Sequence, residues 1–139
     1  MSMEICILSD TQLSSISEWQ RAIDAEGFAL RLSHDEPFTE INGFLPSILR
    51  DKKTGFECYH VDPRELVDTY DNVQFGREWK YALELVWGGD FIEMQAACMA
   101  ATAYARATSG IVFDPQASRL LTPSQGVKVV QDNERVLPR

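Results

Sequence analysis

Apolar and polar residues alternate most regularly between Trp79 and Trp87, in the stretch WKYALELVW. Large apolar side chains occupy every second position there, which predicts a β-strand with one buried face. Two glycines end this strand, and Asp90, three residues before a glutamate, is typical of a helix N-terminus. The helix predicted from there ends at Gly110, and residues 111–113 begin another strand. We interpret the apolar stripe as core beneath a helix, although its two tryptophans lie at the strand ends and could reach the rim.

Similar patterns predict the other elements of the chain. Ser15, Asp62 and Thr122 each precede an apolar-periodic segment and are typical helix N-caps. The first strand is apolar on both faces, which predicts a central position in the sheet. We expect a turn at residues 50–54, between two strands of a hairpin, and an edge strand or bulge at Pro46. The predicted elements are strands over residues 4–9, 28–32, 44–49 and 55–61, and helices over 16–26, 63–70 and 123–130.

The order of these elements predicts the fold class. Helices follow some strands, whereas hairpins follow others, so a doubly wound parallel sheet is not expected. We predict an α+β fold: a single-domain layered α/β sandwich with a mixed or mainly antiparallel sheet and helices packed on one face. Residues 1–130 form this domain, and residues 131–139 form a polar C-terminal tail.

Composition narrows the classes of function. The chain has 139 residues and a formal net charge of -8, which disfavours nucleic-acid binding but can attract a basic protein. No apolar run approaches the roughly 20 residues of a membrane span, and no basic segment precedes an apolar one at the N-terminus. The three cysteines lie in apolar or strand-like segments, which suits reduced, buried thiols in a cytoplasmic protein.

One candidate for chemistry is the alternating trio Cys58, His60 and Asp62, which a strand would project from one face. Such a trio could form a thiolate nucleophile with its base, or part of a metal site. The structural alternative is a core cysteine and a helix-capping aspartate. No second cluster of Cys and His completes a metal shell, so we predict no metal and no cofactor.

A second candidate is the pair Asp90 and Asp114, which the two strand ends could bring together for acid–base chemistry. Capping by Asp90 and turn formation by Asp114, which precedes a proline, are the structural alternatives. The loop residues His34, Asp35 and Glu36 offer too few ligands for a cation and are expected to be solvated.

The chain also resembles a group of small bacterial proteins of about this length that have no established activity. The resemblance covers most of residues 19–116 and follows the motifs at 19–28, 43–46 (GFLP), 55–57 (GFE), 87–90 (WGGD) and 110–116 (GIVFDPQ). It implies no catalytic residues. Proteins of this size and acidity include immunity proteins that neutralise bacterial toxins, a link by analogy only.

The expected function is therefore that of a non-catalytic protein-binding module of the toxin-immunity type, with a basic protein such as a toxin as its partner. Two alternatives stay open. The first is a small enzyme that uses Cys58 and His60. The second is a self-associating structural module, a homo-oligomer that associates through a strand edge near residues 44–49 or an exposed part of the aromatic stripe.

Overall fold

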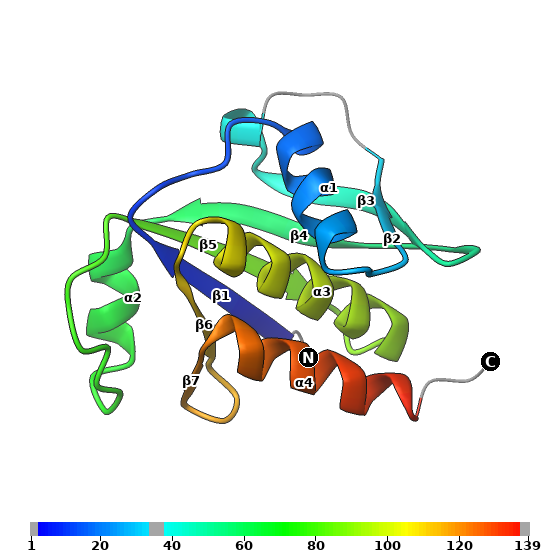
Figure 1. Cartoon of the computed structure of the whole chain (residues 1–139). Coiled ribbons are helices and arrows are strands. Elements are labelled where there is room, and N and C mark those ends of the chain that lie inside the picture. Colours follow the sequence, from blue (N-terminus) through cyan, green and yellow to red (C-terminus); the bar gives the residue numbers. More distant parts are fainter. Residues whose placement is uncertain (1–2, 34–37, 137–139) are drawn as a thin grey trace.

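The computed structural model of the chain describes residues 3–33 and 38–136 and contains one β-sheet with helices on it (Figure 1). The predicted loop cluster at residues 34–36 lies outside the described residues. The strands are β1 (Met3–Ser9), β2 (Leu30–Leu32), β3 (Gly43–Leu49), β4 (Lys52–Val61), β5 (Tyr81–Trp87), β6 (Ile111–Asp114) and β7 (Arg119–Leu121). The helices are α1 (Ile16–Ala25), α2 (Pro63–Thr69), α3 (Phe91–Ala107) and α4 (Pro123–Glu134), and a 3-10 turn spans Phe38–Glu40.

The sheet has seven strands in the order β2-β3-β4-β5-β1-β6-β7, and every neighbouring pair is antiparallel. This confirms the predicted α+β layered fold. β1 lies between β5 and β6, as its two apolar faces predict. Its side chains alternate between two separate hydrophobic clusters, with Ile5 and Ile7 in the larger one and Cys6 and Leu8 in the smaller one.

Helices α1, α3 and α4 cover one face of the sheet (Figure 1). The alanine-rich α3 lies against the strands, since small side chains let a helix approach a sheet closely, and α1 and α4 pack beside it. Trp19 of α1 is fully buried, and its indole N–H donates to the Ala100 carbonyl at 3.0 Å. Its ring packs edge-on against Phe38 and Tyr104. These contacts join α1, α3 and the 3-10 turn into the main core.

The short helix α2 lies apart from the other three helices and packs on the opposite face (Figure 1). Asp62 begins this helix by accepting a hydrogen bond from the Arg64 amide at 2.9 Å. Leu66 of α2 and Phe75 of the following loop meet Leu8 and Phe113 in the smaller cluster. The prediction that helices pack on one face of the sheet therefore holds for α1, α3 and α4. Helix α2 lies on the opposite face of the sheet and covers only part of it.

Several predicted boundaries are wrong. β4 begins at Lys52, so Leu49 pairs with Lys52 and the predicted five-residue turn is a tight one with Arg50 at a φ of 58°. Strand β7, which pairs with β6, has no counterpart in the sequence prediction. The last helix continues past Val130 to Glu134, whose carboxylate accepts a hydrogen bond from the Gln95 amide group at 2.8 Å.

The edge predicted near residues 44–49 is present only in the first part of β3. The outermost strands are β2 and β7, but β2 pairs with residues 47–49 of β3 alone, so among the described strands residues 43–46 pair only with β4. Pro46 lies in this edge portion. Its carbonyl accepts from the Ser33 amide, and its missing N–H leaves no ladder bond unmade because β2 has already ended at Leu32.

The five large side chains of the predicted stripe at residues 79–87 do not all lie in the main core. Leu83, Leu85 and Trp87 are buried in the main core as predicted, but Tyr81 is 39% exposed. Trp79 precedes β5 and packs against the smaller cluster on the α2 side, with the Arg77 guanidinium 4.2 Å from its ring centre. The strand starts two residues later than its alternation suggested, so the first tryptophan is free to turn to the other face.

Among the helices of the described residues, none combines the length and the apolar character needed to cross a membrane.

Candidate functional site

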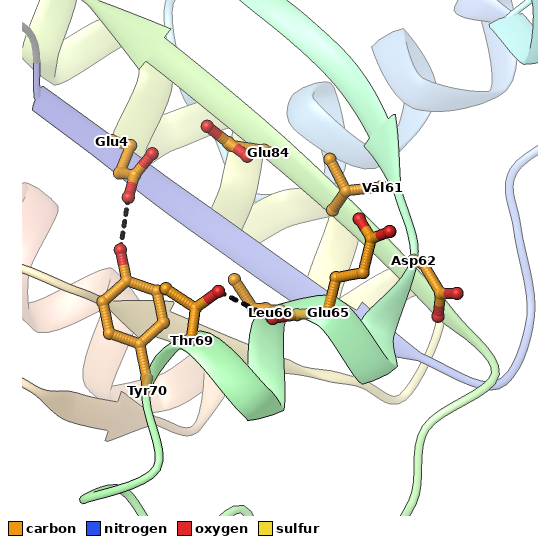
Figure 2. Close-up of a pocket in the computed structure, with 8 residues that line it drawn as sticks. All are labelled: Glu4, Val61, Asp62, Glu65, Leu66, Thr69, Tyr70 and Glu84. Atoms are coloured by element: carbon orange, nitrogen blue, oxygen red, sulfur yellow. Dashed lines mark hydrogen bonds between the residues drawn. The ribbon is translucent and has the colours of Figure 1, made fainter.

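An acidic pocket lies between α2 and the sheet, and we call it the α2 pocket (Figure 2). It encloses about 240 Å³. Four of its eight lining residues carry carboxylates, and none is a lysine, arginine or histidine. The lining residues are Glu4, Val61, Asp62, Glu65, Leu66, Thr69, Tyr70 and Glu84.

Strand pairing brings the acidic side chains of the sheet together. Glu4 of β1 pairs with Val86, and Glu84 of β5 pairs with Cys6, so the two glutamates lie on adjacent strands and on the same face. Both lie within strands whose other residues are mostly apolar. The carboxylates are neighbours in space although more than half of the length of the chain separates them in sequence (Figure 2).

Helix α2 and the residue that ends it supply the other wall. The Tyr70 hydroxyl, just past the end of α2, donates to the Glu4 carboxylate at 2.7 Å (Figure 2). This bond favours the neutral hydroxyl and raises the pKa of Tyr70 well above its ordinary value. The Glu65 side chain rises from α2 toward the sheet, whereas the Asp62 carboxylate points away from Glu4 (Figure 2).

Glu84 is the residue of the pocket whose side-chain pKa matters most. Its pKa is raised to about 7, mainly by burial and then by the hydrogen bond with, and the repulsion from, the Glu4 carboxylate. Cys6 lies opposite Glu84 in the strand register, and burial and the nearby glutamates raise the pKa of its thiol as well. The pocket therefore holds a site where negative charge is costly, and a cationic group would relieve that cost.

The trio Cys58, His60 and Asp62 is only partly brought together. Cys58 and His60 lie on the inner face of β4, opposite Leu85 and Leu83, while Asp62 is diverted to cap α2. The backbone amide of Arg64 and its guanidinium lower the pKa of Asp62. His60 packs against the Phe38 ring, and its Nε2 lies 3.1 Å from the Phe38 carbonyl oxygen. Because a carbonyl only accepts hydrogen bonds, Nε2 is the donor in this contact.

Cys58 is fully buried in the main core. Burial raises the pKa of its thiol to about 12, so the thiol stays protonated at pH 7. That environment suits a small core residue rather than a nucleophile.

Asp90 and Asp114 have separate structural tasks. Asp90 caps α3 by accepting a hydrogen bond from the Ile92 amide at 2.7 Å. Asp114 orders the turn after β6 by accepting hydrogen bonds from the backbone amide and the side chain of Gln116. Asp90 borders a hollow beside Gly55 of β4, whereas Asp114 lies on β6. Two strands, β5 and β1, lie between β4 and β6, so the structure does not bring the two aspartates together.

In the described part of the chain, no group of three or more His, Cys, Asp or Glu side chains is arranged to hold a metal ion.

Sequence reasoning missed the main members of the α2 pocket, namely Glu4, Glu65, Tyr70 and Glu84. The available signal was a glutamate in each of two largely apolar strands, which is unusual where both faces of a strand are covered. Nothing in the sequence shows that these two strands are neighbours.

No protein-family model, curated protein or solved structure matches the chain.

Proposed function

We propose that this chain is a non-catalytic protein-binding module of the toxin-immunity type, and that the α2 pocket receives a cationic side chain of a basic protein partner. The single observation that carries the proposal is the composition of the pocket, with four carboxylates and no cation among its lining residues. The overall charge of -8 adds long-range attraction for a basic surface, which increases association rates.

Electrostatics favour a cationic ligand over an anionic or neutral one. An ammonium or guanidinium group placed beside Glu4 and Glu84 would offset their mutual repulsion and replace the proton that Glu84 holds near neutral pH. Arginine would also offer the paired N–H groups that carboxylates bind best. Binding should therefore release protons around pH 7.

Both alternatives have less support from the structure. The enzyme that would use Cys58 and His60 needs a thiolate, and the Cys58 thiol is buried and protonated. Self-association through a strand edge meets an obstacle at β2. There the Gln20 side chain accepts from the Leu32 amide and donates to the Leu30 carbonyl, both at 2.8 Å. These two bonds occupy the backbone groups that an added strand would use.

The test pairs the protein with the product of the gene next to its own. Calorimetry would compare the unaltered protein, the double variant Glu4→Gln/Glu84→Gln and the control Asp51→Asn/Asp68→Asn, which removes two exposed carboxylates elsewhere. We expect the unaltered and control proteins to bind with similar affinity, the pocket variant to bind at least tenfold more weakly, and protons to be released at pH 7. No complex, or one that neither salt nor the pocket variant weakens, would overturn the proposal.

A further inference from the structure

Beyond the α2 pocket, the same face of the sheet carries a row of side chains that run across four strands. The register aligns Phe44 of β3 with Glu57 of β4, Glu57 with Val86 of β5, and Val86 with Glu4 of β1. Phe44 is 59% exposed, and the other three are only partly buried. We call these four residues the open row; it ends at Glu4, in the wall of the α2 pocket.

The carboxylates of the open row have no cationic partners among the described residues. The ion pairs there use five other acidic side chains, those of Asp10, Glu26, Asp62, Asp132 and Glu134. Glu57 instead accepts a hydrogen bond from the Tyr59 hydroxyl. Two carboxylates without a cationic partner among the described residues thus flank the apolar Val86, an arrangement complementary to a positively charged segment with apolar side chains.

The apolar end of the open row is held in place. A Cβ atom on Gly55 would lie 2.4 Å from the tip of the Phe44 ring, so the ring lies directly over the glycine and uses the space that a side chain would fill. An exposed aromatic ring supported in this way loses little freedom on binding, which favours its use as an anchor. Lys53, Asp90 and Glu93 border the hollow beside it.

The spacing of the row suggests the shape of its occupant. Neighbouring strands lie about 4.8 Å apart, so Phe44 and Glu4 are separated by roughly 14 Å. An extended chain rises about 3.4 Å per residue, and side chains four positions apart lie on the same side about 14 Å from each other.

We propose that the open row binds an extended segment of the basic partner, with an apolar side chain on Phe44 and an arginine or lysine four residues away between Glu4 and Glu84. This inference rests on the proposed function and adds the chemistry and spacing of the partner's segment. A segment that bound by charge alone would need no contact with Phe44.

The probe is a five-residue peptide, blocked at both ends, with leucine first, arginine last and serines between. Amide chemical shifts of the isotope-labelled protein would follow its titration. We expect shifts at Phe44, Glu57 and Val86, and at least threefold tighter binding than by a peptide in which leucine and arginine are adjacent. Replacing leucine with serine should weaken binding at least threefold, and replacing arginine with glutamine should abolish it.

The variant Phe44→Ser should reduce affinity for the leucine peptide to that of the serine peptide. Tyr81→Ser is the matched control, because Tyr81 is another partly exposed aromatic residue, 39% exposed, at the opposite end of β5 from Trp87. If Phe44→Ser fails to fold, the leucine and serine peptides still test the same contact on the unaltered protein.

The outcomes separate the two proposals. Equal affinities for the leucine and serine peptides, with arginine still required, would overturn the open row as a docking surface and leave the α2 pocket as a cation site. Binding that ignores the arginine-to-glutamine change would overturn both.

Discussion

Replacing Glu84 with glutamine should stabilise the protein at alkaline pH and have little effect in acid. The glutamine keeps the shape of the side chain but removes a charge that Glu4 and the partly apolar surroundings oppose. The groups around this carboxyl are Glu4 and Cys6 on β1, Tyr59 on β4, Glu65 on α2 and Tyr70 just after α2. None of them is a cation that would favour the ionised form.

The sign and size of this change in stability follow from the proton that the Glu84 carboxyl binds. Its pKa is about 7 in the folded protein, against an ordinary value of 4.5. The bound proton therefore contributes stability that is fully present below pH 4.5 and is lost as the pH rises through 7. At about 1.36 kcal/mol per pH unit this interval is worth roughly 3.4 kcal/mol at most. Because Glu84 is only partly buried, screening by solvent reduces it to about 1–2 kcal/mol.

Urea unfolding followed by tryptophan fluorescence would measure this effect at pH 4.5 and pH 8. The free energy of unfolding of Glu84→Gln, relative to the unaltered protein, should rise by about 1–2 kcal/mol between these pH values. Asp68→Asn, which removes an exposed carboxylate from α2, is the control and should show no such rise. The same difference at both pH values, or a decrease toward pH 8, would refute this account of the pocket.

Three other changes test the fold around the site. Gly110→Ala should lower the free energy of unfolding by about 2 kcal/mol or more, because its Cβ would lie 2.3 Å from the Leu8 carbonyl oxygen; an unchanged melting temperature would contradict this contact. Cys58 should resist iodoacetamide at pH 7 in the native protein and react in urea, since its thiol is buried and protonated; rapid native alkylation, read by mass spectrometry, would restore it as a candidate nucleophile. Gln20→Ala should cost about 1–2 kcal/mol and increase self-association in sedimentation, because it exposes the backbone groups of β2; a protein that stays monomeric at the same concentrations would show that this edge is protected by other means.

Local features of the chain were predictable because they depend on residues close in sequence. Ser15, Asp62, Asp90 and Thr122 were all expected to cap helices, and each accepts a hydrogen bond from an amide of the first turn of its helix. Such caps need only a short polar side chain within two or three residues of the amide it accepts from. The α+β class follows from the order of these local elements.

Boundaries were less predictable where a partner strand decides them. The start of β4 at Lys52 depends on pairing with Leu49 across the hairpin, and β7 exists as a strand through its pairing with β6. In the same way, Trp79 falls outside β5 and reaches the α2 side. In these segments, pairing and packing outweigh the weak preferences of three or four residues.

The sequence by itself therefore determined the helices, most strands, the acidic charge and the layered fold class, all of which depend on local pattern or composition. The tertiary structure alone decided the strand order, the position of α2 on the other face and the candidate site. Glu4, Glu84 and Tyr70 form that site because β1 and β5 are neighbours and α2 ends beside them. The pairing of distant strands reflects the collective packing of the core, and no local pattern contains it.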